Sequence, residues 1–79
     1  MEKIAAILIG YGMDFQYENY GSGGENITSF ELSLEVTFQN GKIFVTNGPD
    51  KHEFHDTPNK RSGLVGLVEQ ICIDETASF

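Results

Sequence analysis

With 79 residues, the chain has the length of one domain, and it carries 12 Asp and Glu side chains against 5 Lys and Arg, a formal net charge of −7. Such a charge repels the phosphates of nucleic acids and of anionic membranes, so direct binding to either is not expected. A hydrophobic share of 39%, with three tyrosines and six phenylalanines, is nevertheless enough for a folded core and argues against a disordered chain. We therefore expect residues 1–79 to form a single acidic domain.

The number of cysteines and the hydropathy of the chain constrain the cellular compartment in which the protein is expected. Cys72 is the only cysteine, so no disulfide can form within the chain and a reducing setting, the cytoplasm, is expected. No run approaches the roughly 18 apolar residues that a membrane-spanning helix needs.

The first predicted element is a helix near the N-terminus. Apolar residues recur there at helical spacing, at Ile4, Ile7, Leu8 and Tyr11. This spacing predicts a helix that ends near Gly10 or Gly12. The consecutive apolar residues 7–9 also suit a buried strand, which is the alternative interpretation.

Residues 14–26 are predicted to form a flexible loop. They contain the run Gly21-Ser22-Gly23-Gly24, which does not favour regular structure, together with Tyr17 and Tyr20.

The strongest pattern in the chain is the alternation from Ser29 to Gln39. Its apolar positions are Phe30, Leu32, Leu34, Val36 and Phe38. Its polar positions are Glu31, Ser33, Glu35, Thr37 and Gln39. A period of two over this length predicts one strand with one face buried and the other in water.

A two-residue turn is predicted at Asn40-Gly41, because this pair readily adopts positive φ at both central positions of a type I′ turn. Such a turn fixes the register of the hairpin. The expected opposed pairs are Gln39 with Lys42, Phe38 with Ile43, Thr37 with Phe44, and Val36 with Val45.

The second half of the chain predicts one more strand and one more helix. A turn at residues 47–50 precedes a short strand over Lys51–His55 that places Phe54 inward. Thr57-Pro58 then resembles a helix N-cap followed by proline at the first helical position. A helix of about four turns is expected, with its core positions at Leu64, Leu67, Val68 and Ile71 and with Gly63 and Gly66 weakening it.

The predicted fold is therefore α+β, with an N-terminal helix, a three-stranded antiparallel meander and a C-terminal helix (αβββα), and with both helices on the apolar face of the sheet. This order resembles that of double-stranded RNA-binding domains, which place basic residues near the start of the second helix, as at Lys60 and Arg61 here. The acidic side chains would repel RNA, so the resemblance is one of topology.

No motif for catalysis or metal binding emerges, and we expect neither an enzyme nor a cofactor. The cluster His52-Glu53-Phe54-His55-Asp56 is the most site-like, but on a strand its two imidazoles point to opposite faces and cannot hold one ion. Gly10-Tyr11-Gly12 lacks the third glycine of a dinucleotide-binding turn. Cys72 lies among Ile71, Ile73 and Asp74 with no adjacent base, so it is expected to pack against the sheet.

The distribution of carboxylates is the remaining signal. Glu2, Asp14, Glu18, Glu25, Glu31 and Glu35 lie in the first half of the chain, opposed there only by Lys3. Alternate residues of a strand repeat at about 6.6–6.8 Å, which is close to the phosphate spacing along one nucleic-acid strand. If Glu31 and Glu35 share one strand, they stand on its water-facing side at about twice this repeat. The same charges are also expected if they serve only solubility or protect a sheet edge from aggregation.

In size, charge and α+β layout the chain resembles the small acidic anti-defence proteins of phages, including anti-CRISPR proteins and DNA-mimic inhibitors. This resemblance implies a stoichiometric inhibitor, in the cytoplasm of a host cell, that covers a basic nucleic-acid-binding surface of a nuclease or defence complex. On that hypothesis the binding residues are Glu31, Glu35, Glu18, Glu25, Tyr17, Tyr20 and Phe44. The alternative is a structural or assembly module that acts as a homodimer, paired through edge strands or helices.

Overall fold

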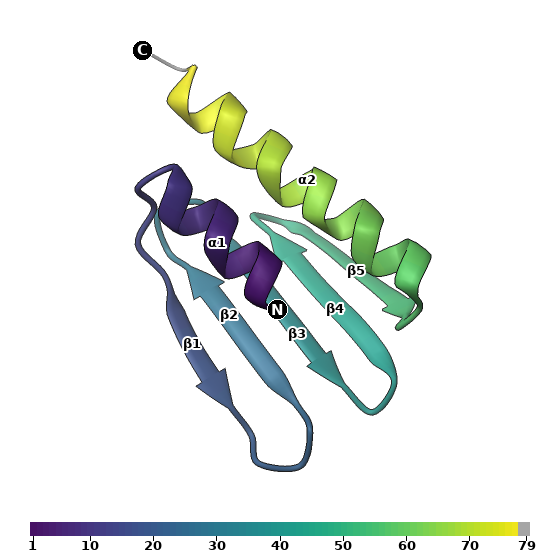
Figure 1. The fold of residues 1–79 in the computed structure, drawn as a ribbon. Coiled ribbons are helices and arrows are strands. Elements are labelled where there is room, and N and C mark those ends of the chain that lie inside the picture. The colour runs from purple at the N-terminus through teal and green to yellow at the C-terminus, as the bar shows by residue number, and fades with distance from the viewer. Residues whose placement is uncertain (78–79) are drawn as a thin grey trace.

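A computed structural model describes residues 1–77, and in them the chain forms two helices and five strands (Figure 1). In chain order these are α1 (Glu2–Gly10), β1 (Gln16–Asn19), β2 (Glu25–Ser29), β3 (Leu34–Gln39), β4 (Lys42–Asn47), β5 (Asp50–His55) and α2 (Pro58–Thr76). Neither described helix combines the length and the apolar character that crossing a membrane requires.

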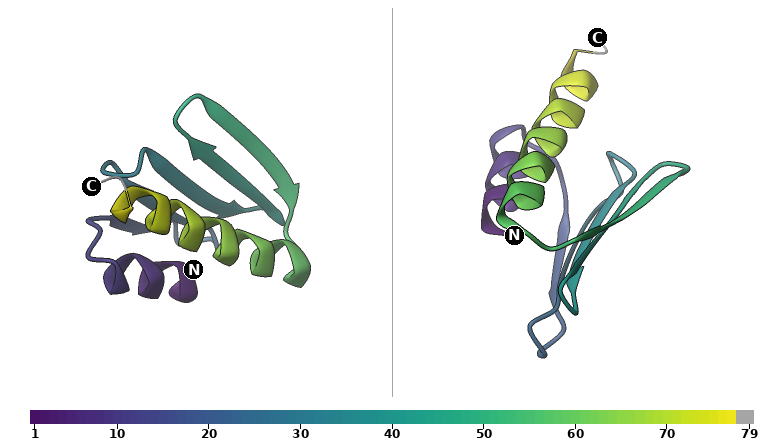
Figure 2. Two further views of the ribbon diagram at one scale, coloured as in Figure 1. Left: turned by 90° about the horizontal axis from the view of Figure 1, so that it is seen from above. Right: turned by 90° about the vertical axis from the view of Figure 1, so that its right-hand side faces the viewer.

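The five strands form one antiparallel sheet in the order β1-β2-β3-β4-β5, so each strand pairs with its neighbour in the sequence. Both views in Figure 2 show α1 and α2 on the same side of this sheet, where the two helices contact each other. The other side of the sheet is uncovered. The α+β class and the helix–meander–helix order are confirmed, whereas the predicted number of three strands is wrong.

The hairpin at Asn40-Gly41 has the predicted geometry. Asn40 has φ 54° and Gly41 has φ 72°, as a type I′ turn requires. β3 and β4 pair in the predicted register, from Gln39 opposite Lys42 to Val36 opposite Val45. Turn chemistry and the hydrophobic pattern therefore specify the same pairing.

The single strand predicted from Ser29 to Gln39 is wrong, because a turn over residues 30–33 divides it into the end of β2 and the whole of β3. Ser33 adopts a left-handed φ of 51°, and its N–H donates to the Phe30 carbonyl (3.2 Å). Leu32 stays buried, as the alternation predicts, whereas Phe30 is 75% exposed instead of facing the core. A tight turn can thus preserve an alternating pattern while reversing the chain.

The flexible loop predicted over residues 14–26 is also wrong, because this segment contains β1 and the start of β2. All four residues of β1 are exposed, so no hydrophobic alternation marks this strand in the sequence. Backbone pairing with β2 holds it instead, and this pairing continues past the strand end, where the Tyr20 N–H donates to the Gly24 carbonyl (2.9 Å).

Both helices are confirmed. α2 begins as predicted, with Pro58 in its first turn and with the Thr57 side-chain oxygen accepting a hydrogen bond from the Lys60 N–H (3.2 Å). At 19 residues α2 has about five turns, one more than expected. Its buried stripe is Leu64, Val68 and Cys72, and Leu67, a predicted core position, is 43% exposed.

The core lies between the helices and the covered side of the sheet. Its fully buried hydrophobic side chains are Ile4, Leu8, Ile27, Leu34, Val36, Ile43, Val45, Val68 and Cys72. The predicted inward position of Phe54 on β5 is consistent with its packing against this cluster. The strand side chains on the uncovered side of the sheet are mostly polar, and Phe44 on β4 is the exception among the described strands.

Candidate functional site

Charge is segregated across the sheet. Residues 11–41, which build β1, β2, β3 and their turns, contain no lysine or arginine. Their acids are Asp14, Glu18, Glu25, Glu31 and Glu35. The cations lie elsewhere, with Lys3 on α1, Lys42 on β4, Lys51 on β5, and Lys60 and Arg61 at the start of α2. We call β1, β2, β3 and their turns the acidic half of the molecule.

Two of the predicted carboxylates share the uncovered face of the sheet. Directly opposed residues point to the same side, so the register places Glu18 beside Asn26 and Thr37, and Glu35 beside Thr28. Glu18 on β1 is in line with Thr37 on β3, two strands away, and Glu35 is two residues further along β3. The Cα atoms of Glu18 and Glu35 are therefore separated by about 12 Å. Both side chains belong to exposed residues.

A hollow of about 580 Å³ lies over this part of the sheet. Its lining residues come from β1, β2, β3 and the β1–β2 turn, and they are Gln16, Tyr17, Glu18, Tyr20, Asn26, Thr28 and Glu35. Glu18 and Glu35 give the hollow a negative lining with no cation among its residues. Its shape and charge suit a basic group of a partner.

The polar side chains under this hollow are ordered by hydrogen bonds. The Thr28 hydroxyl lies 2.9 Å from Asn26 Oδ1, and Asn26 Nδ2 donates to the Thr37 hydroxyl oxygen (2.9 Å). The same Thr28 hydroxyl lies 3.4 Å from Glu35 Oε2. Because a hydroxyl has one proton, the shorter contact to Asn26 takes it, and Glu35 keeps its capacity to accept hydrogen bonds from a partner.

Tyr20 stands at the rim of the hollow and is 41% exposed. A Cβ atom on Gly24 would lie 3.0 Å from Tyr20 Cδ2, so the ring packs against Gly24 at a point where a side chain would crowd it. This contact supports the ring while leaving its other surface available.

Tyr17 and Glu25 are directed to the helix-covered side, which the sequence alone did not indicate. Tyr17 is opposed to the buried Ile27, and its hydroxyl donates to Glu25 Oε1 (2.7 Å). This hydrogen bond to the carboxylate raises the pKa of the Tyr17 phenol. Tyr17 borders the hollow, but its hydroxyl is engaged away from the uncovered face.

Glu31 and Phe44 also lie outside the hollow. Glu31 is in the β2–β3 turn, where its Oε1 accepts a hydrogen bond from the Asp14 N–H (3.2 Å), so the expected row of Glu31 and Glu35 along one strand is absent from the described residues. Phe44 is 38% exposed on β4, opposed to Thr37 and Glu53 on the uncovered face. It is an exposed apolar side chain among polar neighbours on that face.

Three residues of the hollow were missed by the sequence analysis: Gln16, Asn26 and Thr28. Gln16 and Asn26 lie in the segment predicted to be a loop, and Thr28 lies between that loop and the predicted strand, so the face of the sheet on which each side chain lies could not be assigned. The alternation of Asn26 and Thr28 around the apolar Ile27 was the available signal.

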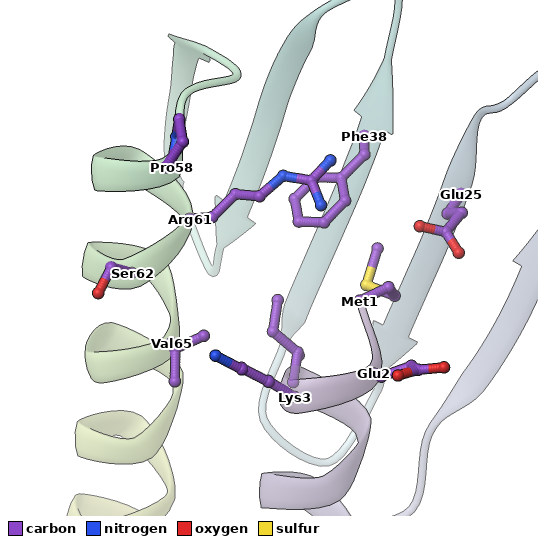
Figure 3. A pocket seen from close by; sticks show the side chains of 10 residues that line it. Met1, Glu2, Lys3, Glu25, Phe38, Pro58, Arg61, Ser62 and Val65 are labelled. Atoms are coloured by element: carbon purple, nitrogen blue, oxygen red, sulfur yellow. The ribbon is translucent and has the colours of Figure 1, made fainter.

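A second cleft, of about 530 Å³, lies between the start of α1, the first turns of α2 and the sheet (Figure 3). Arg61 crosses it, with its guanidinium carbon 4.4 Å from the centre of the Phe38 ring and two nitrogens 2.6 and 2.7 Å from the Asp56 carboxylate oxygens. The hydrogen bonds to Arg61 lower the pKa of Asp56 and raise that of Arg61. Lys60 lies over Phe54 at 5.2 Å. Both basic residues of the RNA-binding resemblance are therefore engaged within the molecule.

The Asp56–Arg61 pair predicts a specific response to acid. Because the folded pKa of Asp56 is below its unfolded value, the pair contributes its full stability above pH 5 and loses it as the pH falls through the folded pKa. With the Arg61 side chain 48% exposed, the contribution is about 1 kcal/mol. Asp56→Asn should remove this loss, measured as the change in urea unfolding free energy between pH 7 and about pH 2.5. Asp50→Asn, on β5, is the control, and equal pH dependence in wild type and Asp56→Asn would contradict the prediction.

The histidine cluster and the cysteine do not form a reactive centre in the described part of the chain. His52 and His55 are on β5, where their odd and even positions put them on opposite faces. Within residues 1–77 no three His, Cys, Asp or Glu side chains gather to hold a metal. Cys72 is fully buried on α2, as predicted, and burial raises the pKa of its thiol, which disfavours the thiolate.

Among the described residues, the acidic half with its hollow is thus the feature that joins shape, charge and exposed side chains. The lining of the hollow contains four residues of the predicted binding set and adds three polar neighbours; the four are Glu18, Glu35, Tyr20 and, with its hydroxyl turned away, Tyr17. Comparison of the chain with protein-family models, with curated proteins and with solved structures gave no match.

Proposed function

We propose that this protein is a stoichiometric inhibitor that covers a basic, nucleic-acid-binding surface of a nuclease or host defence complex in the cytoplasm, as anti-CRISPR and DNA-mimic proteins of phages do. The observation that supports it is the acidic half, in which three contiguous strands carry carboxylates and no cation. The inhibitor acts by occupying the surface and performs no catalysis.

The physical argument rests on long-range attraction followed by local fit. A patch of one sign accelerates encounter with a surface of the opposite sign by about 10- to 1,000-fold at low salt. The hollow then receives a lysine or arginine of the partner between Glu18 and Glu35. Tyr20 and Phe44 provide exposed aromatic surface on either side, and aromatic residues commonly dominate binding energy at such interfaces.

A cleavage assay tests this function with defined probes. The protein is titrated into DNA cleavage by guide-loaded RNA-guided nucleases and by restriction endonucleases, and inhibition is expected to saturate near one inhibitor per enzyme. The double variant Glu18→Lys/Glu35→Lys should need at least about tenfold more protein for half-inhibition, because the partner's cations now meet like charges. Its inhibition should also depend less on salt.

The matched control is Glu69→Lys/Glu75→Lys, which makes the same change in net charge on exposed residues of α2. It should inhibit nearly as well as the wild type, because these positions lie outside the acidic half. An equal loss for both double variants would show that only total charge matters. Absence of inhibition throughout the panel would count against a nuclease target.

A further inference from the structure

The strand β5 is an open edge of the sheet. It has six residues, pairs only with β4 among the described strands, and is followed directly by the turn into α2. The Asp56 N–H donates to the Gly41 carbonyl of the β4 side (2.9 Å), so even-numbered residues direct their backbone groups toward β4. By alternation, Lys51, Glu53 and His55 present their N–H and C=O groups outward.

The side chains along this edge are complementary to themselves. Lys51 and Glu53 are exposed, are two residues apart and stand on the same, uncovered face of the sheet. Lys51 makes no ion pair with any described residue, whereas Glu53 Oε2 lies 3.1 Å from Lys42 Nζ. A lysine on an edge strand normally discourages pairing with another chain. Here an antiparallel second copy would supply a glutamate to meet it.

We propose that β5 pairs with β5 of a second copy of this chain around a two-fold axis at His52, forming a continuous ten-stranded sheet. In this register Lys51 of each copy is opposed to Glu53 of the other, and these pairs exchange the outward backbone hydrogen bonds. Glu53 then lies between Lys42 of its own chain and Lys51 of the second copy. His52 is opposed to His52 on the helix-covered side.

The neighbouring registers are less favourable. Only registers that oppose residues 51, 53 and 55 to one another can form backbone hydrogen bonds. A two-fold axis at Glu53 would oppose Glu53 to itself, and one at Lys51 would oppose Lys51 to itself. An axis at Phe54 would oppose Lys51 to Thr57 and Glu53 to His55, so Lys51 would meet no carboxylate across the edge.

The other open edge of the sheet lacks this complementarity. The Tyr20 N–H donates to Gly24, so in β1 the outward backbone groups belong to Tyr17 and Asn19. Pairing Tyr17 of one copy with Asn19 of a second copy, the register that corresponds to the one proposed for β5, would oppose Glu18 to Glu18. The charges on β1 therefore discourage self-pairing, and the two edges have different roles. Because the acidic half lies at the β1 edge, pairing through β5 leaves it uncovered.

Sedimentation equilibrium of the whole chain tests the proposal. At millimolar concentration the mass should approach twice the 8.8 kDa of one chain. Lys51→Glu and Glu53→Lys should each be monomeric, because each homodimer would oppose two like charges twice. Mixed in equal amounts, these two variants should restore the dimer, because both opposed pairs are then of opposite sign. A monomeric wild type, or dimers that both variants retain, would overturn the proposal.

Cross-linking tests the register independently. Opposed residues in a pair without mutual backbone hydrogen bonds have Cα atoms about 4.5 Å apart, within the range of a disulfide. His52→Cys should thus form an intermolecular disulfide under mild oxidation. His55→Cys should not, because in this register it is opposed to Pro49 of the second copy and not to a second cysteine. Cys72 is buried and does not compete. Equal cross-linking of both variants would contradict the register. The cleavage assay with the Lys51→Glu variant, which leaves Glu18 and Glu35 unchanged, measures nuclease inhibition separately from dimer formation.

Discussion

Replacing Ile27 by alanine is expected to remove a large part of the protein's free energy of unfolding at 25 °C. Ile27 is fully buried at the centre of β2, between Tyr17 on β1 and Val36 on β3. Removing its side chain costs about 2–5 kcal/mol in lost burial and residual cavity. A domain of this size is expected to have about 4–12 kcal/mol of stability in total. Urea unfolding followed by circular dichroism measures the change.

The matched control for this substitution is Ile9→Ala. Ile9 is 66% exposed on α1, so the same deletion removes little buried surface and alanine favours the helix. Its effect should stay within about 0.5 kcal/mol. If Ile9→Ala destabilised the protein as much as Ile27→Ala, the assignment of the core between the helices and the sheet would be incorrect.

Replacing Gly41 by valine is expected to destabilise the β3–β4 hairpin by about 2 kcal/mol, because a β-branched residue is strained at φ 72°. In a chain of this length the midpoint of thermal unfolding should fall by about 8–16 °C. Space is not the cause, since a Cβ atom at Gly41 meets no atom within 4 Å. Thermal unfolding measures this loss.

A second glycine substitution, which is expected to stabilise the protein, provides the comparison. Gly63 lies in the interior of α2, is exposed, and would also place its Cβ in open space. Gly63→Ala should therefore stabilise the helix by about 0.5–1 kcal/mol. A stabilising effect of Gly41→Val would mean that the Asn40-Gly41 turn does not have the described conformation.

The contrast between β3–β4 and β1 shows what the sequence could predict. In β3 and β4 one face is apolar and the turn residues specify φ, so two independent signals agreed on the register. In β1 every residue is exposed and the strand is held by backbone pairing, which leaves no hydrophobic period to detect. Ser33, with its left-handed φ, divided a pattern that otherwise fitted one strand.

The same contrast explains the candidate site. The acidic character of residues 11–41 was visible in the sequence, but the facing of each carboxylate depended on strands that had not been recognised. Glu18 and Glu35 share a face because β1 lies two strands from β3 in matching register. Glu25 is one residue before Asn26 on β2, so its side chain points to the covered side of the sheet. Glu31 lies in the turn between β2 and β3 and not on a strand.

The meander topology has a consequence for how the chain folds. Every strand pairs with its neighbour in the sequence through a short connection, so most of the sheet forms without closing long loops, and isolated hairpins form in about 1–10 μs. The exception is the contact between α1 and α2, which joins the two ends of the chain. Completion of the core therefore waits for α2, which is the last described element to leave the ribosome during synthesis.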